Sequence, residues 1–320
     1  LEGIPAQDAL KHMALMMYNA DDPNQAATVF LLQKSPLTEA QIQLLNQGGV
    51  ALNMSPLYLP GVFETLFAGL GAGSMHVDDF LVQTDYNLAP TDDNQPFFFN
   101  LTPGLPEALR TLLMAAGAAL ILYLLAMLGR RSRPSAAQLV YFGGLGLGFM
   151  LIETPLIQRT ILAAGSPTLS MAVVLIALML GGGLGSWLSG RWPAEGLWRR
   201  LSLAALAVAV LAAGLAFWQP VLLAALSGLP AAARLILAGL SLLPLGFVMG
   251  MPFANGLRLA GERERGLLPY LWGWNAVTSV AGSALAAALA LLIGFQLGLL
   301  AGAGAYLLAG AAAWWCGRRA

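Results

Sequence analysis

Four polar residues within the apolar half of this sequence are the ones most able to do chemistry there. Glu153, Gln158 and Arg159 lie in one apolar stretch, and Arg234 lies near the start of another. Charged and amide side chains are costly in hydrocarbon, so they usually contact a polar partner, a cavity or a ligand. Glu153 and Arg159 are six positions apart and project from different faces of a helix, which makes Arg234 an equal candidate partner for Glu153. We expect either a structural interhelical bond or a site for a substrate, a proton or a lipid headgroup.

Two asparagines mark the ends of later apolar segments. Asn255 and Asn275 each lie near one end of such a segment. Because the last backbone groups of a helix lack intrahelical partners, we expect these amides to cap helix ends or to cross-link them.

A different group precedes the first long apolar segment. Phe97, Phe98 and Phe99 are consecutive there, where aromatic rings can anchor in the bilayer interface. Asp92 and Asp93 lie just before them, in a turn bounded by two prolines. We expect interfacial anchoring from the phenylalanines, and we keep contact with a ligand as an alternative role for either aspartate.

The sequence offers no recognisable metal site or catalytic group. It has one cysteine, Cys316, and two histidines, His12 and His76, both outside the apolar half. A cysteine-based zinc or iron–sulfur site, or a haem held within the apolar half, is therefore not expected. We assign no metal, no cofactor and no catalytic residue.

Composition identifies the class of protein. Apolar residues make up 58% of the chain, charged residues make up 10%, and the mean hydropathy is +0.71, values that do not fit a soluble protein. The zero net charge combines 12 Asp and Glu against 2 Lys in residues 1–107 with 14 Arg against 4 Glu afterwards. We therefore expect an acidic extramembrane domain over residues 1–104 and a basic transmembrane domain over residues 105–320.

The second domain is expected to be an α-helical polytopic membrane domain, since about 20 apolar residues are needed to cross hydrocarbon. Residues 219–230 are apolar but too few, so we expect them at the interface. Small residues four positions apart, such as Gly182 and Ser186, predict close helix packing. The seven predicted spans are residues 107–128, 137–163, 168–190, 200–218, 232–254, 269–292 and 297–316.

Arginines alternate between the predicted loops. The loops after the first, third and fifth spans and the tail after the seventh are basic, whereas the other loops have no basic residue beyond Arg159 and Arg234 at helix ends. Because positively charged short loops stay in the cytoplasm, we expect a cytoplasmic C-terminus, an extracytoplasmic N-terminal domain and a location in the bacterial inner membrane.

The N-terminal domain mixes helix and strand patterns, which indicates a partial α/β layer. Two strands do not bury a sheet edge, so further strands are expected, and the start at Leu1 without a leader favours a piece of a longer or processed polypeptide. The expected elements are a helix over Ala6–Asn19, a strand over Ala27–Leu32, a helix from a capping box of Thr38 and Gln41 to about Asn46, and a strand over Val50–Met54.

Several motifs together resemble bacterial membrane-bound spermidine-synthase-like proteins. The resemblance implies the second half of a Rossmann-like, methyltransferase-like domain followed by the C-terminal transmembrane bundle. In that family the first half of the domain holds the adenosyl cofactor and the catalytic residues, and no position here matches them. The motifs are Phe149 to Arg159, Gly182 to Arg191, Gly250 to Phe253, Trp274 to Val277, Thr28 to Leu37 and Thr91 to Phe99.

Three functions are compatible with these features. The first is a non-catalytic accessory or scaffold subunit with partners in a membrane complex, the lipid bilayer around it and no nucleic acid. The second is an aminopropyltransferase-type enzyme completed by a missing N-terminal half. The third is a carrier of a small molecule that uses the intramembrane Glu153.

Overall fold

The computed structural model describes residues 4–18, 27–83, 91–97, 104–128 and 133–318. The chain forms two compact units, Leu1–Ala89 and Pro90–Ala320. The segment 91–97 thus belongs with the helical unit, although it precedes the boundary that composition suggested. Phe98 and Phe99 lie outside the described residues.

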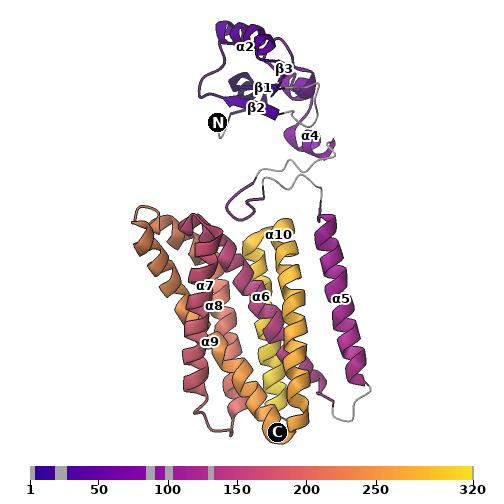
Figure 1. Cartoon of the computed structure of the whole chain (residues 1–320), viewed down its shortest axis with the longest axis vertical. Helices are drawn as coiled ribbons and strands as arrows, with labels where there is room; N and C mark the ends of the chain where they lie inside the picture. The colour runs from indigo at the N-terminus through magenta and orange to yellow at the C-terminus, as the bar shows by residue number, and fades with distance from the viewer. Residues whose placement is uncertain (1–3, 19–26, 84–90, 98–103, 129–132, 319–320) are drawn as a thin grey trace. The chain divides into compact units, whose positions relative to one another are not determined.

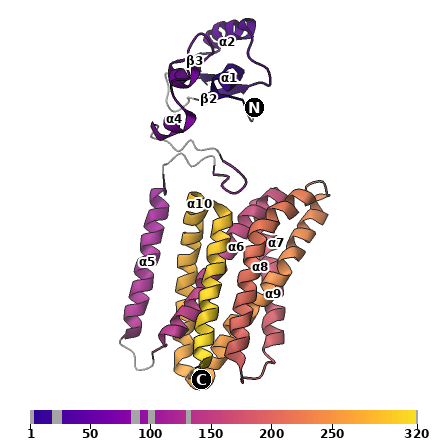
Figure 2. The same cartoon turned by 180° about the vertical axis from the view of Figure 1, so that it is seen from behind.

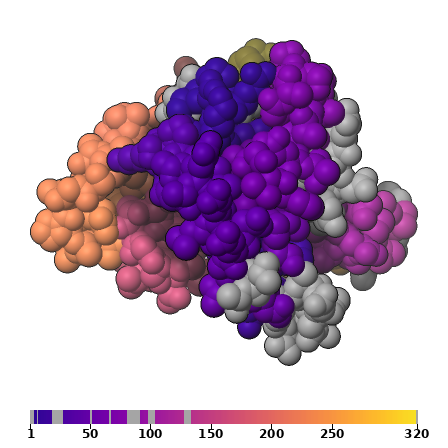
Figure 3. Space-filling view, turned by 90° about the horizontal axis from the view of Figure 1, so that it is seen from above, coloured from indigo at the N-terminus to yellow at the C-terminus, as the bar shows by residue number. Residues whose placement is uncertain are grey.

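The first unit is built on a three-stranded antiparallel sheet. Strand β1 (Met13–Tyr18) is central, between β2 (Ala27–Leu32) and β3 (Met54–Tyr58). Both pairings are antiparallel, whereas a Rossmann sheet is mainly parallel. The described strands therefore define a small α/β unit without establishing a Rossmann fold. Its residues form a continuous surface in the space-filling view, coloured indigo to purple (Figure 3).

The helix predicted over Ala6–Asn19 is wrong for most of its length. Only α1 (Ala6–Ala9) and a 3-10 turn (Leu10–His12) are helical, and β1 follows directly. Ala14 and Met16 are buried, with more exposed residues between them, so the segment packs with the two-residue period of a strand. The methionines and leucines of this segment fit both the 3.6-residue period of a helix and the two-residue period of a strand. Hydrogen-bonded pairing with β2 and β3 stabilises the strand.

The second predicted helix exists but is longer than expected. Helix α2 (Glu39–Ala51) begins at the predicted capping box, in which the Thr38 backbone N–H donates to Gln41 Oε1 at 2.9 Å. Gly49 lies inside this helix because it packs against Met16 and Met54, where a side chain would not fit. The strand predicted over Val50–Met54 consequently begins only at Met54.

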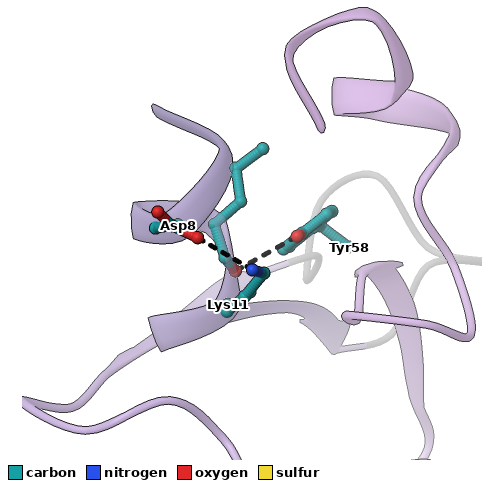
Figure 4. A network of polar contacts seen from close by, with 4 residues as sticks. Asp8, Lys11 and Tyr58 are labelled. Carbon is teal, nitrogen blue, oxygen red and sulfur yellow. Dashed lines mark hydrogen bonds and ion pairs between the residues drawn. The ribbon is translucent and has the colours of Figure 1, made fainter. Parts of the chain in front are cut away.

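Polar contacts join the start of the first unit to β3. Tyr58 donates its phenolic hydrogen to the carbonyl of Leu10 at 3.1 Å, and Lys11 pairs with Asp8 at 2.8 Å (Figure 4). The hydrogen bond from Lys11 lowers the pKa of Asp8, whereas burial raises the pKa of Tyr58. The remaining short elements of this unit are a 3-10 turn (Thr65–Phe67), α3 (Ala68–Gly71) and α4 (Val77–Gln83).

The second unit is a bundle with six helices long and apolar enough to cross a membrane among the described residues. They lie roughly side by side in both views (Figures 1 and 2). These six helices support a multi-pass membrane protein. They are α5 (Glu107–Leu128), α6 (Ala136–Ala164), α7 (Pro167–Ser189), α8 (Leu197–Leu226), α9 (Ala231–Arg263) and α10 (Leu268–Arg318), with a 3-10 turn (Arg265–Leu267) before the last.

Helix α10 is interrupted at Gly294. Its φ of 85° and ψ of 169° are not helical, and the residues before and after it form two helical halves that lie side by side (Figures 1 and 2). Only glycine adopts this backbone conformation without strain. The two halves correspond to the predicted spans 269–292 and 297–316.

Residues 219–226 do not form a separate interfacial piece, as the sequence suggested, but continue α8. Pro220 lies inside this helix, and a proline leaves the carbonyl four residues earlier without its usual donor. That carbonyl belongs to Ala216, and it accepts a hydrogen bond from Arg159 at 3.0 Å. The helix therefore continues through the proline because another helix supplies the missing donor.

Helices α7 and α9 pack backbone against backbone. A Cβ atom added at Gly181 would lie 2.7 Å from the carbonyl oxygen of Leu243, and one added at Gly185 would overlap the carbonyl of Phe247. The contact is thus centred on Gly181 and Gly185, one residue before the predicted Gly182 and Ser186. Such close approach maximises dispersion contacts between helices in lipid.

Arginines from several helices gather at one end of the bundle. Arg258 of α9 donates to the carbonyl of Trp192 at 2.7 Å, and Arg199, Arg263 and Arg318 line one depression there. Arg318 also lies 4.0 Å above the ring centroid of Trp314. The basic loops that alternate along the sequence therefore lie together at one end of the bundle. Segment 91–97 and the Gly294 turn lie at the opposite end.

Candidate functional site

Arg159 is the most deeply buried charged residue described in the bundle. It lies in α6, just over a turn before the helix ends, and is 4% exposed. Its Nη1 donates to the Ala216 carbonyl freed by Pro220, and its Nη2 donates to Asn94 Oδ1 at 3.1 Å. A guanidinium has five N–H donors, so three remain beyond these two bonds.

Asn94 joins three elements of the bundle. Its Oδ1 accepts from the backbone N–H of Gln296 at 2.8 Å as well as from Arg159, and its backbone carbonyl accepts from Phe295 at 3.0 Å. A Cβ at Gly294 would collide with the Asn94 amide, so the glycine also makes room for this side chain. Asn94 therefore closes the turn of α10 and positions Arg159.

The backbone around Asn94 is held by its neighbours. Asp92 Oδ1 accepts from the backbone N–H groups of Asn94 at 2.9 Å and Gln95 at 2.7 Å. The Gln95 side chain donates to the carbonyl of Leu291 at 3.3 Å. Phe97 packs edge to face on Phe295, with ring centroids 5.6 Å apart. This phenylalanine therefore contacts the α10 turn, a position that is compatible with the expected interfacial anchoring.

A cavity of about 560 Å³ lies beside Arg159, between the ends of α6 and α8. Its charged lining consists of Arg159, Asp92 and Asp93. Asp93 forms no hydrogen bond or ion pair with the described residues, and Asp92 uses one oxygen for the turn. Buried positive charge and more exposed negative charge thus share one cavity. The remaining lining is Asn94, Gln296 and Ser227 with Leu162, Ala163, Ala216, Phe217, Pro220, Leu223 and Ala224.

A second buried polar pair, Gln219 of α8 and Thr160 of α6, lies next to Arg159. Gln219 is 2% exposed and donates from Nε2 to Thr160 Oγ1 at 3.4 Å, while Thr160 donates to the carbonyl of Leu156 at 2.7 Å. Gln219 Oε1 is buried and has no hydrogen-bond partner. An orphaned buried acceptor is costly, so a water molecule or another donor is expected there.

Glu153 is buried but stands apart from this cavity. It is 7% exposed and forms no hydrogen bond or ion pair with the described residues. It lies two helical turns from Gly146, which packs against Asn275 and Thr278 of α10. The alternative pairing with Arg234 is not formed among the described residues, and Arg234 instead donates to the carbonyl of Ser227 at 3.4 Å.

The other predicted polar residues serve the bundle in different ways. Asn255 donates to Ser189 Oγ at 2.7 Å and so cross-links α9 to α7. Asn275 donates to the carbonyl of Phe142 at 2.9 Å and so cross-links α10 to α6. Gln158 is exposed on α6 and lies outside the cavity lining.

The first unit presents a second candidate site, the outer edge of β2. No described strand pairs with this edge, and Phe30 and Leu32 on it are both 54% exposed. The Gln33 backbone N–H donates to the carbonyl of His12, on the β1 side. Because backbone groups alternate sides along an antiparallel strand, the N–H groups of Thr28, Phe30 and Leu32 point away from β1. They are available to another strand.

Neither unit shows a catalytic constellation in its described part. Groups of three or more His, Cys, Asp or Glu that could hold a metal are not found among the described residues. His12 Nδ1 lies within hydrogen-bonding distance of the carbonyl oxygen of Gln33, at 3.2 Å.

Comparisons of this chain with protein-family models, with curated proteins and with solved structures found no match.

Two residues of the site were missed by sequence reasoning. Asn94 was considered only as part of a polar turn, and Gln219 only as the start of an interfacial piece. The available signal was the same for both: an amide next to a proline or acid at the edge of an apolar segment. Their partners are far along the chain, 65 positions between Asn94 and Arg159 and 59 between Gln219 and Thr160.

Proposed function

We propose that this chain is a non-catalytic accessory subunit of a membrane complex, and that its first unit binds a partner protein by strand addition along β2. The observation that carries the proposal is the free edge of β2. Three backbone N–H groups and the exposed Phe30 and Leu32 lie there together. Main-chain hydrogen bonds to an added strand supply affinity, and alternate side chains supply specificity.

A single substitution tests this edge. Thr28→Pro removes one outward N–H and leaves the hydrogen bonds toward β1 in place, since proline is tolerated on the outer side of an edge strand. We expect it to weaken partner binding by about tenfold or more. The measurement is the mass of the complex after mild detergent extraction from native membranes, compared with the 33.5 kDa chain.

Thr28→Val is the matched control, because it keeps the N–H and the β-branched shape. It should retain the complex. A wild-type chain that is always monomeric would overturn the accessory role, and equal complex formation by all three proteins would overturn the use of β2.

We also propose a topology of seven crossings with the basic end in the cytoplasm of a bacterium. The turn at Gly294 supports counting α10 as two spans, and seven crossings place the chain's two ends on opposite faces of the membrane. The clustered arginines support the orientation.

Cysteine labelling tests this topology in a Cys316→Ser background. Lys34 and Glu195 are both exposed, one in the first unit and one between α7 and α8. In intact spheroplasts, an impermeant thiol reagent should label Lys34→Cys at once and Glu195→Cys only after permeabilisation. Labelling of both, or of Glu195→Cys alone, would refute the orientation.

Membership of the spermidine-synthase-like family stays part of this proposal, supported by the motifs of both units. An aminopropyltransferase role would need cofactor-binding residues that no position of this sequence matches. A carrier role would need Glu153 to meet a substrate, and Glu153 does not line the Arg159 cavity. The free edge of β2 therefore favours the accessory role over both.

A further inference from the structure

We propose that the Arg159 cavity binds the zwitterionic headgroup of an aminophospholipid, with its phosphate on Arg159 and its ammonium on Asp92 and Asp93. This inference does not depend on the accessory role. It rests on the charges of the cavity, on its position in the bundle and on the surface that leads out of it.

The first step is the anion. Arg159 is held by Asn94 and Ala216 at 3.1 and 3.0 Å, and three of its N–H donors remain. It has no carboxylate partner among the described residues. A phosphate is the group that a planar, pre-positioned guanidinium binds best, through two parallel charge-assisted hydrogen bonds.

The second step is the cation. A simple anion would meet the carboxylates of Asp92 and Asp93 in the same cavity, which disfavours it. A molecule with an ammonium next to its phosphate satisfies both charges. A primary ammonium donates three hydrogen bonds, and the free oxygens of Asp92 and Asp93 can accept them. A quaternary ammonium cannot donate any.

The third step is the apolar part of the ligand. More than half of the cavity's lining residues are apolar, and Leu162 and Phe217 among them are 56% and 61% exposed. On α8 the exposed surface continues from Phe217 toward the middle of the bundle through Val210 and Leu206, which are 63% and 47% exposed. In a membrane these side chains face hydrocarbon, so an acyl chain can leave the cavity along α8. The cavity lies at a bundle end, the depth at which headgroups lie.

Binding of short-chain lipids to the full chain in detergent tests the proposal. We expect dioctanoyl phosphatidylethanolamine to bind more tightly than the phosphatidylglycerol and phosphatidylcholine of the same chain length. Asp93→Asn should lower the affinity for phosphatidylethanolamine about fivefold and leave that for phosphatidylglycerol equal or higher. Arg159 is left intact because it also joins Asn94 to α8.

Glu107→Gln is the matched control: it neutralises an exposed carboxylate at the start of α5, outside the cavity lining. It should bind as the wild type does. Equal affinity for all three lipids, or an equal loss in the Glu107→Gln variant, would overturn the headgroup site. Free phosphoethanolamine that binds as tightly as the lipid would overturn the lipid as the source of this chemistry.

Discussion

Replacing Gly185 by leucine should separate α7 from α9 and lower the free energy of unfolding by about 3 kcal/mol or more. A Cβ at this position would overlap the carbonyl of Phe247, which is backbone and cannot rotate away. The helices must therefore move apart, which also breaks the hydrogen bond of 2.7 Å between Asn255 and Ser189. Thermal unfolding of the detergent-solubilised chain, followed by tryptophan fluorescence, measures the loss.

Gly183→Leu is the control for this prediction. Gly183 lies two positions away on the same helix, is exposed, and has no atom within 4 Å of an added Cβ. Leucine there replaces a poor helix former by a good one without touching α9. If both variants unfold at the same temperature, close packing of α7 on α9 is not what stabilises this pair of helices.

Replacing Asn94 by alanine should cost about 2–4 kcal/mol, because two donors lose their acceptor at once. The Gln296 backbone N–H and one arm of the Arg159 guanidinium both depend on Asn94 Oδ1. The α10 turn would then keep only the backbone bond from Phe295 to Asn94. A lower unfolding midpoint, together with faster proteolysis near residue 294, is the expected result.

Asn94→Asp is the control for this prediction, because it changes the residue but keeps an acceptor oxygen at the position of Asn94 Oδ1. Aspartate keeps an oxygen for both donors, and its charge strengthens the bond to Arg159. Its stability should be close to that of the wild type. Alanine and aspartate variants of equal stability would mean that Asn94 does not hold the α10 turn through its side chain.

The sequence alone was sufficient to locate the apolar helices, although α8 continues to Leu226 and α9 to Arg263, beyond their predicted ends at residues 218 and 254. About 20 consecutive apolar residues are a local property, and burial in hydrocarbon forces their backbone into helices whatever their neighbours are. The same local argument identified Arg159 as an unusual residue and the arginines as marks of one bundle end. The seven predicted apolar segments correspond to α5–α9 and the two halves of α10.

Short elements were decided by tertiary contacts instead. Residues 13–18 have apolar residues at spacings that suit a helix or a strand, and the β2 and β3 partners make them a strand. Gly49 and Pro220 look like helix ends in the sequence. Both lie within helices in the structure. Met16 and Met54 pack closely against Gly49, and Arg159 donates a hydrogen bond to the carbonyl that Pro220 leaves without a donor.

The partners of the polar residues also could not be found from the sequence. Its periodicity shows which face of a helix a side chain occupies, but not which other segment meets that face. Arg159 finds its two acceptors 57 and 65 positions away, one created by a proline and one by a turn before α5. Composition thus determined that a charged residue would be buried in this bundle. Only the packing of α6, α8 and segment 91–97 decided what satisfies it, because hydrogen bonds depend on positions in space that a linear pattern does not specify.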